Sequence, residues 1–155
     1  MEDPITVRLR RLAATERLAT RLARTVRPGD ALLLEGPLGA GKSTLARAFL
    51  RALAGDPLLE VPSPSYTLMQ SYELPAGVVA HHFDLYRLSG PADLGELGWE
   101  EAREGIVLVE WPDRLGTLRP SGAEALTLAM AFTSVDEVRV ATLSGWPDRL
   151  EGLPA

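Results

Sequence analysis

The chain has 155 residues, of which 46% are hydrophobic and 24% charged, with a formal net charge of −5 at pH 7. This composition is typical of a single globular domain that is large enough to bury a core. The absence of cysteine excludes disulfides and thiolate metal sites, and the acidic charge argues against a stand-alone nucleic-acid-binding protein, which normally has a basic face.

The N-terminus and the hydropathy pattern both favour the cytoplasm. Met1 to Pro4 lack the basic and then apolar layout of a signal peptide. No apolar run approaches the roughly 20 residues of a membrane-spanning helix. We therefore expect a cytoplasmic protein without a membrane segment, with residues 1–155 forming one domain.

The first elements in the chain are a strand and an amphipathic helix. Residues 5–10 alternate between apolar and polar side chains, which predicts a half-exposed strand. Residues 14–26 have apolar side chains at helical spacing, while Arg17, Arg21 and Arg24 share the other face. We interpret this basic face as solvated surface, with docking to RNA or an acidic partner as the alternative.

Residues 36–43 form the strongest motif, Gly-Pro-Leu-Gly-Ala-Gly-Lys-Ser, which fits G-x-x-x-x-G-K-[ST] at every fixed position. An apolar strand-like run at 31–35 precedes it, and a helical pattern at 44–53 follows. In this arrangement, backbone N–H groups can wrap a phosphate, and the helix N-terminus favours negative charge. Lys42, the only lysine in the chain, is expected to reach the β- and γ-phosphates, and the Ser43 hydroxyl to bind magnesium. Because motif and context occur together, a chance glycine-rich turn is disfavoured.

A loop and a hairpin follow the predicted P-loop helix. Two prolines keep residues 61–67 out of regular structure, and their hydroxyl groups favour a loop over the nucleotide; a rigid surface turn is the alternative. Strand-like runs at 67–73 and 78–84, joined by a turn at 74–77, predict a hairpin. Asp84 stands at the end of the second strand.

The two histidines, His81 and His82, lie within that second strand. They have no neighbouring metal-ligand residues in the sequence, so we interpret them as strand residues rather than catalytic ones. Short helical pieces are expected at 91–97 and 99–103.

Residues 106–110, Ile-Val-Leu-Val-Glu, have the Walker B layout of four aliphatic residues followed by a carboxylate. The apolar run buries the strand, and Glu110 emerges at the carboxyl edge of the sheet, where open α/β folds bind ligands. Many strands end in glutamate, so the pattern gains its force from the P-loop that accompanies it.

Two further strands, antiparallel to each other, are expected at 125–132 and 137–143. The pentapeptide Trp-Pro-Asp-Arg-Leu occurs at both 111–115 and 146–150, which we interpret as coincidence. Together the elements predict an α/β fold of the P-loop NTPase type: a three-layer sandwich with a mixed, mainly parallel sheet plus antiparallel strands.

Four motifs in order carry a resemblance to a known family. They are Gly-Pro-Leu-Gly-Ala-Gly-Lys-Ser-Thr at 36–44, Ser-Pro-Ser-Tyr-Thr at 63–67, His-Phe-Asp-Leu-Tyr-Arg-Leu at 82–88 and Val-Glu-Trp-Pro at 109–112. The chain resembles the TsaE (YjeE) family, the small P-loop ATPases of bacterial tRNA threonylcarbamoyladenosine synthesis. The resemblance extends from Thr15 to Val140.

The resemblance implies ATP and Mg²⁺ as ligands, with Ser43 and Glu110 holding the metal. Lys42, Asp84 and Glu110 are the implied catalytic residues, and Asp84 is the one needed for hydrolysis. Residues 63–67 would form a switch-like loop, and Trp111 would lie beside the site. Thr15 would contact the base region. The implied nucleotide-binding set is Thr15, Gly39, Ala40, Gly41, Lys42, Ser43, Thr44, Asp84 and Asp113.

The chain departs from the family pattern at three positions. Ser43 and Ser65 stand where threonine is common, and serine keeps the hydroxyl in both cases. Pro37 stands where an acidic residue is common, and it removes both an N–H group and a charge from the loop.

The resemblance also implies partners. The chain would act with TsaD and TsaB and meet tRNA only through their complex, while TsaD transfers the threonylcarbamoyl group. Hydrolysis is expected to be slow until the partners are added. One alternative is a small-molecule kinase, against which the sequence offers no arginine-rich lid and little room for a second substrate. The other is a nucleotide-binding interaction module without turnover.

Overall fold

The computed structural model describes residues 4–151, so the interpretation of the N-terminus concerns residues that lie largely outside it. Short 3₁₀ helices supplement the main elements at 75–77, 91–97, 112–118 and 122–124. The helices and strands are β1 (Ile5–Leu9), α1 (Leu12–Thr25), β2 (Ala31–Glu35), α2 (Lys42–Ala54), β3 (Met69–Glu73), β4 (Val79–Asp84), α3 (Trp99–Ala102), β5 (Ile106–Glu110), β6 (Ala125–Phe132) and β7 (Arg139–Gly145).

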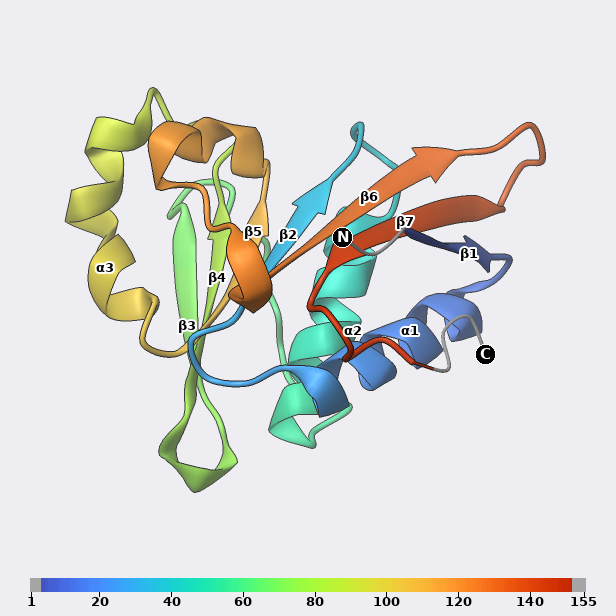
Figure 1. The fold of residues 1–155 in the computed structure, drawn as a ribbon, viewed down its shortest axis with the longest axis horizontal. Coiled ribbons are helices and arrows are strands. Elements are labelled where there is room, and N and C mark those ends of the chain that lie inside the picture. Colours follow the sequence, from blue (N-terminus) through green and yellow to red (C-terminus); the bar gives the residue numbers. More distant parts are fainter. Residues whose placement is uncertain (1–3, 152–155) are drawn as a thin grey trace.

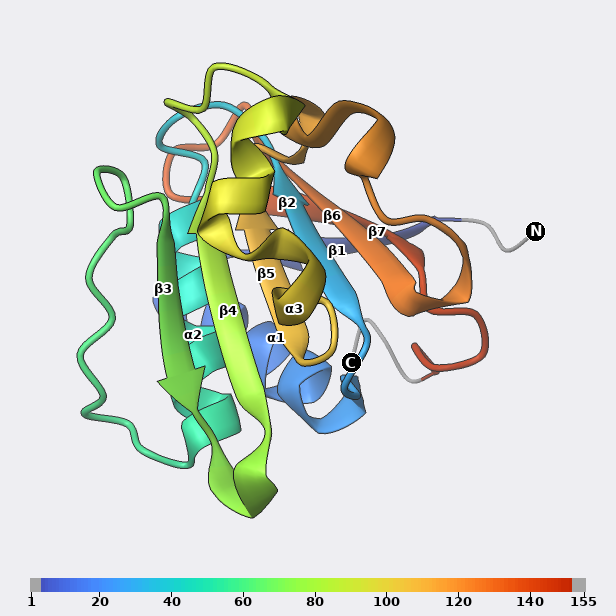
Figure 2. The same cartoon turned by 90° about the vertical axis from the view of Figure 1, so that its left-hand side faces the viewer.

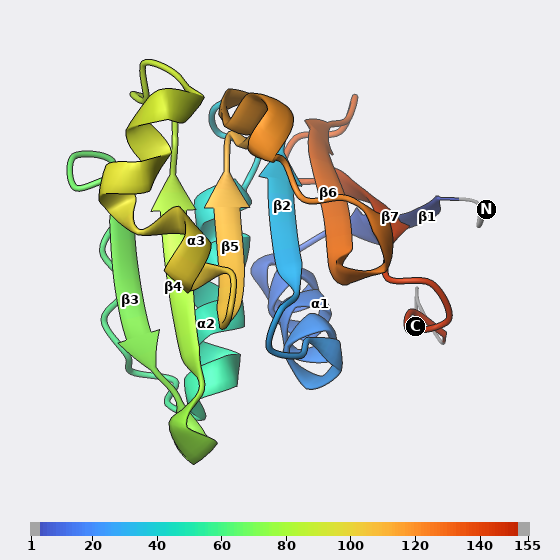
Figure 3. The ribbon, with the colours of Figure 1, turned by 60° about the vertical axis from the view of Figure 1, so that its left-hand side comes forward.

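The strands form a seven-stranded sheet in the order β1-β7-β6-β2-β5-β4-β3 (Figures 1 and 3). β2 pairs in parallel with both β5 and β6, and β4 pairs in parallel with β5. The outer pairs β1–β7, β6–β7 and β3–β4 are antiparallel. The predicted α/β fold with a mixed sheet is confirmed, with the parallel pairs confined to the centre.

The sheet is covered on both faces, so the predicted three layers are confirmed. Figure 2 shows α1 and α2 behind the sheet, and α3 with the neighbouring 3₁₀ turns in front of it. Successive side chains of a strand point to opposite faces, so Leu32 and Leu34 pack on the α1–α2 side and Leu33 on the other. Burial on both faces explains why β2 and β5 read as continuous apolar runs.

Two predicted strands begin later than expected because a residue before each adopts the left-handed conformation. β3 begins at Met69 rather than at 67, since Leu68 has φ 68° and its N–H closes a turn onto the Pro64 carbonyl at 2.6 Å. β7 spans 139–145 rather than 137–143, since Glu137 has φ 69°. Neither conformation is compatible with a strand. Within residues 4–151, no helix is long and apolar enough to cross a membrane.

The two Trp-Pro-Asp-Arg-Leu copies each follow a strand and share two local features, but their backbones diverge: Asp113 lies in the 3₁₀ helix Pro112–Leu118, whereas Asp148 has φ 64°. Each begins with a left-handed tryptophan, with φ 62° at Trp111 and 43° at Trp146. In each, the arginine N–H donates to the tryptophan carbonyl, at 3.2 and 3.1 Å. The surroundings differ: Arg114 is exposed, whereas Arg149 forms a bidentate ion pair with the buried Asp30, at 2.7 and 3.0 Å. The shared sequence therefore accounts for the left-handed tryptophan and the backbone hydrogen bond, whereas the rest of the turn and the tertiary contacts differ between the copies.

This difference predicts unequal effects on stability. Arg149→Ala leaves the buried Asp30 carboxylate without its cation and is expected to lower the free energy of unfolding by about 3 kcal/mol. Arg114→Ala, the matched change in the exposed turn, is expected to cost no more than about 0.5 kcal/mol. Urea denaturation measures both, and equal losses would contradict the assigned role of the ion pair.

Candidate functional site

The loop between β2 and α2 has the backbone that the P-loop motif requires. Gly36, Gly39 and Gly41 all have positive φ, at 137°, 82° and 105°. A side chain at Gly36 would also collide with the backbone carbonyl oxygen of Met130 on β6. Among the described residues no side chain caps α2, so its first N–H groups remain available to an anion.

A cavity of about 330 Å³ lies at this loop, where β2, β4 and β5 present their carboxyl ends. This is the edge at which open α/β sheets bind ligands. The cavity brings together most of the predicted site residues, from three separate parts of the chain. Its lining consists of Pro37, Leu38, Gly39, Gly41, Lys42, Ser43, Thr44, Ser63, Ser65, Asp84, Tyr86, Arg87, Glu110 and Trp111.

Three predicted residues lie outside that lining. Ala40 is fully buried in the core beneath the loop. Thr15 is buried on α1 and is not among the residues that line the cavity. Asp113 lies in the 3₁₀ turn after β5, close enough to influence the charge of Lys42.

Two oxygen donors meet at the predicted metal position. The Ser43 hydroxyl donates to Glu110 Oε1 at 3.1 Å. This hydrogen bond joins the start of α2 to the end of β5. A hydroxyl and a carboxylate suit Mg²⁺, which binds oxygen, keeps several waters and usually takes only one or two protein carboxylates beside substrate phosphates. Within residues 4–151, no group of three or more His, Cys, Asp or Glu side chains could hold a metal by itself. The residues present therefore fit a magnesium ion shared with a phosphate.

Lys42 is buried and folded back onto its own loop. Its ammonium donates to the carbonyls of Gly36 and Pro37, the latter at 3.2 Å, and lies 4.0 Å from the centre of the Trp111 ring. Pro37 lacks an N–H but still supplies an acceptor, so this proline is compatible with the loop geometry. Lys42 is thus both buried and part of the cavity lining.

The charge of Lys42 is set by opposing effects. Burial lowers the pKa of its ammonium, and the nearby carboxylates of Glu110, Asp84 and Asp113 oppose that shift. A phosphate in the cavity would add negative charge beside the ammonium and would favour its charged form further.

Asp84 is buried and connects β4 to the 63–67 loop. Asp84 and Glu110 are paired residues of β4 and β5, so both side chains lie on the same face of the sheet. Ser65 Oγ donates to Asp84 Oδ2 at 3.2 Å, and the Tyr86 N–H donates to Oδ1 at 3.1 Å. Ser63 and Ser65 share a hydrogen bond of 2.7 Å. A carboxylate has about four acceptor positions, so Asp84 keeps capacity for a water or a hydroxyl.

The interpretation of both histidines as strand residues holds, since both lie in β4, but it missed a contact. His81 meets Ser71 at 2.8 Å, whereas His82 meets Glu110 at 2.7 Å. The available signal was the two-residue spacing from His82 to Asp84, which places both on one face of a strand.

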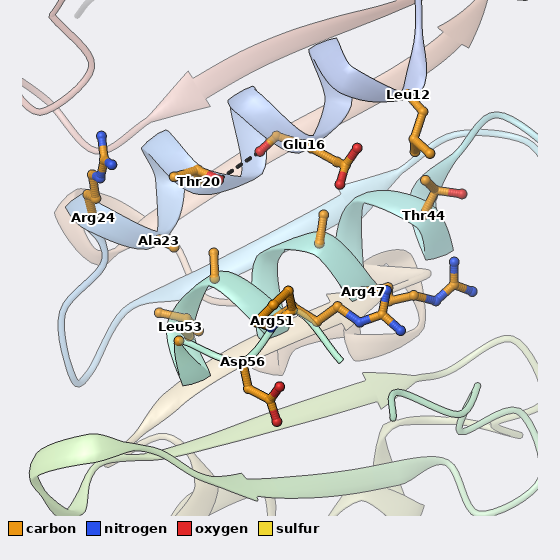
Figure 4. Close-up of a pocket in the computed structure, with 14 residues that line it drawn as sticks. Leu12, Glu16, Thr20, Ala23, Arg24, Thr44, Arg47, Arg51, Leu53 and Asp56 are labelled. Atoms are coloured by element: carbon orange, nitrogen blue, oxygen red, sulfur yellow. Dashed lines mark hydrogen bonds between the residues drawn. The ribbon is translucent and has the colours of Figure 1, made fainter. Parts of the chain in front are cut away.

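A second cavity, of about 540 Å³, lies between α1 and α2 (Figure 4). Its lining includes Leu12, Glu16, Arg47 and Arg51. Asp84 and Glu110, which line the P-loop cavity, are not part of it. Thr44 lines both cavities, so the two adjoin at the start of α2.

A family model and two sequence relatives of this chain carry the same name. The family model described as "Threonylcarbamoyl adenosine biosynthesis protein TsaE" matches residues 9–140. The Rickettsia felis tRNA threonylcarbamoyladenosine biosynthesis protein TsaE is 39% identical over 100 residues, covering 64% of this chain and 57% of that protein. The Bacillus subtilis protein of the same name is 33% identical over 142 residues, covering 90% and 84%.

The structural comparison covers more of the chain. The crystal structure of YdiB from Bacillus subtilis superposes with a TM-score of 0.74 at 28% identity, covering 96% of this chain and 90% of that one. By contrast, the chain spans little more than half the length of the Rickettsia felis and Rickettsia conorii relatives, at 57% and 56%.

Proposed function

The chain belongs to the TsaE family of tRNA threonylcarbamoyladenosine biosynthesis proteins, and on this premise we propose that it is a Mg²⁺-dependent ATPase. It would be required, together with TsaD and TsaB, for threonylcarbamoyladenosine modification of tRNA next to the anticodon. One observation carries the ATPase proposal. At the uncapped start of α2, the Lys42 ammonium, the Ser43 hydroxyl and the Glu110 carboxylate gather around one cavity.

Each side chain has a defined task in the proposed reaction. Lys42 and the first N–H groups of α2 would bind the β- and γ-phosphates. Ser43 and Glu110 would hold Mg²⁺, which when bound neutralises charge on the phosphoryl oxygens. Asp84 would orient the attacking water and accept a hydrogen bond from it. Catalysis would thus depend on positioning and electrostatics, as is usual in phosphoryl transfer.

The nucleoside would extend from the P-loop toward the start of α1. Thr44 links the two cavities, and Figure 4 shows Leu12 of α1 close to it. The proposed contact between Thr15 and the base region would be made at this end of α1. This arrangement leaves the mouth of the phosphate cavity free for another macromolecule.

The mouth of the P-loop cavity has the features of a partner surface. Leu38 and Tyr66 are 66% and 82% exposed, and Tyr86 is also exposed. Exposed apolar side chains that gather in one region mark interaction sites. We propose that TsaD and TsaB contact the 63–67 loop and the Tyr86–Arg87 region. With a net charge of −5, the chain would meet tRNA only through that complex, in the cytoplasm.

The metal site can be tested by nucleotide binding. Mg²⁺ is expected to raise the affinity of the wild-type protein for ADP. Glu110→Ala should reduce this magnesium-dependent gain in affinity by about 10- to 100-fold, which is the contribution expected from one hydrogen bond or contact to a charged group. Ser43→Ala should act in the same direction. Isothermal titration with ADP, in Mg²⁺ or in EDTA, measures the gain.

Glu35 provides a matched control, because it ends the neighbouring strand β2 and its carboxylate accepts from Arg119 at 2.8 Å. Glu35→Ala should keep the full magnesium gain. An unchanged gain in Glu110→Ala would remove Glu110 from the metal site.

A further inference from the structure

His82 is a buried titratable side chain that the proposed reaction does not use. It is 2% exposed, and its Nε2 lies 2.7 Å from Oε2 of Glu110, which is 3% exposed. Its second ring nitrogen, Nδ1, is buried and has no hydrogen-bond partner among the described residues. A buried histidine with one strong contact and one unpaired nitrogen calls for an explanation.

The contact gives the two oxygens of Glu110 different partners. Oε1 accepts from Ser43 at 3.1 Å, and Oε2 is bound by His82. The terminal torsion of a glutamate is broad and has no sharp minimum of its own. Two separate partners therefore fix the carboxylate plane and direct Oε1 toward the Ser43 hydroxyl.

Strand geometry explains why His82 can reach this position. β4 and β5 are parallel and in register, with Asp84 beside Glu110 and His82 beside Leu108. Side chains two residues apart share a face, so His82 lies one step deeper in the sheet than Asp84, on the side that α2 covers. From there its ring points to the carboxylate that ends the neighbouring strand.

The ionised Glu110 carboxylate determines which atom donates in this contact. An ionised carboxylate only accepts, so Nε2 must be the donor to Glu110. Nδ1 is then the ring nitrogen that has no hydrogen-bond partner among the described residues.

We propose that His82 is a positioning residue: its Nε2–H holds the Glu110 carboxylate in the orientation that presents Oε1, beside the Ser43 hydroxyl, to magnesium. The magnesium part of this inference rests on the proposed function, whereas the hydrogen bond and its donor atom do not. Hydrogen-bond partners of metal ligands commonly contribute about 10- to 100-fold to metal affinity.

The test compares two substitutions that differ in the donor. His82→Leu removes the hydrogen bond and is expected to reduce the magnesium-dependent gain in ADP affinity by about 10-fold or more. His82→Gln can place an amide N–H near the position of Nε2 and should retain most of the gain. Affinity for ADP in EDTA should be the same in all variants, and thermal melts confirm that each one is folded.

The matched control is His81→Leu, which changes the neighbouring histidine, bound to Ser71 at 2.8 Å instead of to Glu110. It should leave the magnesium gain intact. In a Glu110→Ala background, His82→Leu should have no further effect on that gain, because the group that His82 positions is gone.

The possible failures are distinguishable. If magnesium raises the affinity of the wild type and His82→Leu keeps the full gain, the positioning role is wrong while the metal site stands. If magnesium has no effect on the wild type, the proposed metal site fails and the role of His82 in it fails with it. Imidazole ¹⁵N NMR tests the hydrogen bond without metal: a proton on Nε2 supports it, and a ring protonated at Nδ1 alone overturns it.

Discussion

Replacing Asp84 with asparagine is expected to lower the rate of ATP hydrolysis by about 10²- to 10⁴-fold, the usual contribution of a positioned acid or base. Asparagine keeps the shape and can still accept a hydrogen bond from Ser65 or from the Tyr86 N–H, which Asp84 binds at 3.2 and 3.1 Å. It loses the negative charge that orients and polarises a water. ATP affinity should change little, because Lys42 and the α2 amides bind the phosphates.

Single-turnover hydrolysis together with equilibrium ATP binding separates these effects. Asp93→Asn, which changes an exposed acidic residue of the 91–97 turn, serves as the control and should keep the wild-type rate. If Asp84→Asn keeps the wild-type rate of ATP hydrolysis, a group other than Asp84 orients the attacking water. Loss of both binding and hydrolysis would instead point to a damaged cavity.

Addition of a TsaD–TsaB pair is expected to raise the hydrolysis rate, on the order of 10³-fold or more if a partner supplies a cation to the γ-phosphate. Within the lining of the P-loop cavity Arg87 is the only arginine. Its guanidinium lies 4.5 Å from the centre of the exposed Tyr66 ring. In this position the guanidinium contacts an aromatic ring at the surface. A second positive charge, besides Lys42, would therefore come from a partner.

Steady-state hydrolysis measured while the partner pair is titrated tests this expectation. Lys42→Ala should show no stimulated hydrolysis, which excludes a contaminating ATPase in the partner preparation. An equally slow rate at saturating partner concentrations would mean that the stimulating charge does not come from TsaD or TsaB.

The parts of the fold that could be predicted from sequence are those with a local signal. β2 and β5 are continuous apolar runs, and the loop at 36–43 has glycines where a positive φ is required. The late starts of β3 and β7 had no such signal, because Leu68 and Glu137 adopt a left-handed conformation that their side chains do not favour.

The site shows the same division. The strand patterns predicted Asp84 at the end of its strand and Glu110 at the carboxyl edge of the sheet, and the structure makes the two residues paired neighbours. The His82–Glu110 contact depends on the register of β4 against β5, which no local pattern encodes. The strand order, with β6 next to β2, likewise results from tertiary packing.

The central claim is that ATP hydrolysis by this chain serves tRNA modification through its partners, and it is most directly tested in one reaction. ATP hydrolysis and threonylcarbamoyladenosine formation are followed together while TsaD, TsaB and tRNA are titrated against the wild-type chain or Asp84→Asn. We predict that hydrolysis is slow for the chain alone, that hydrolysis and repeated rounds of modification rise together with the partners, and that Asp84→Asn stops both. Fast hydrolysis without the partners, unchanged by their addition and unrelated to modification, would contradict the account and favour a small-molecule kinase.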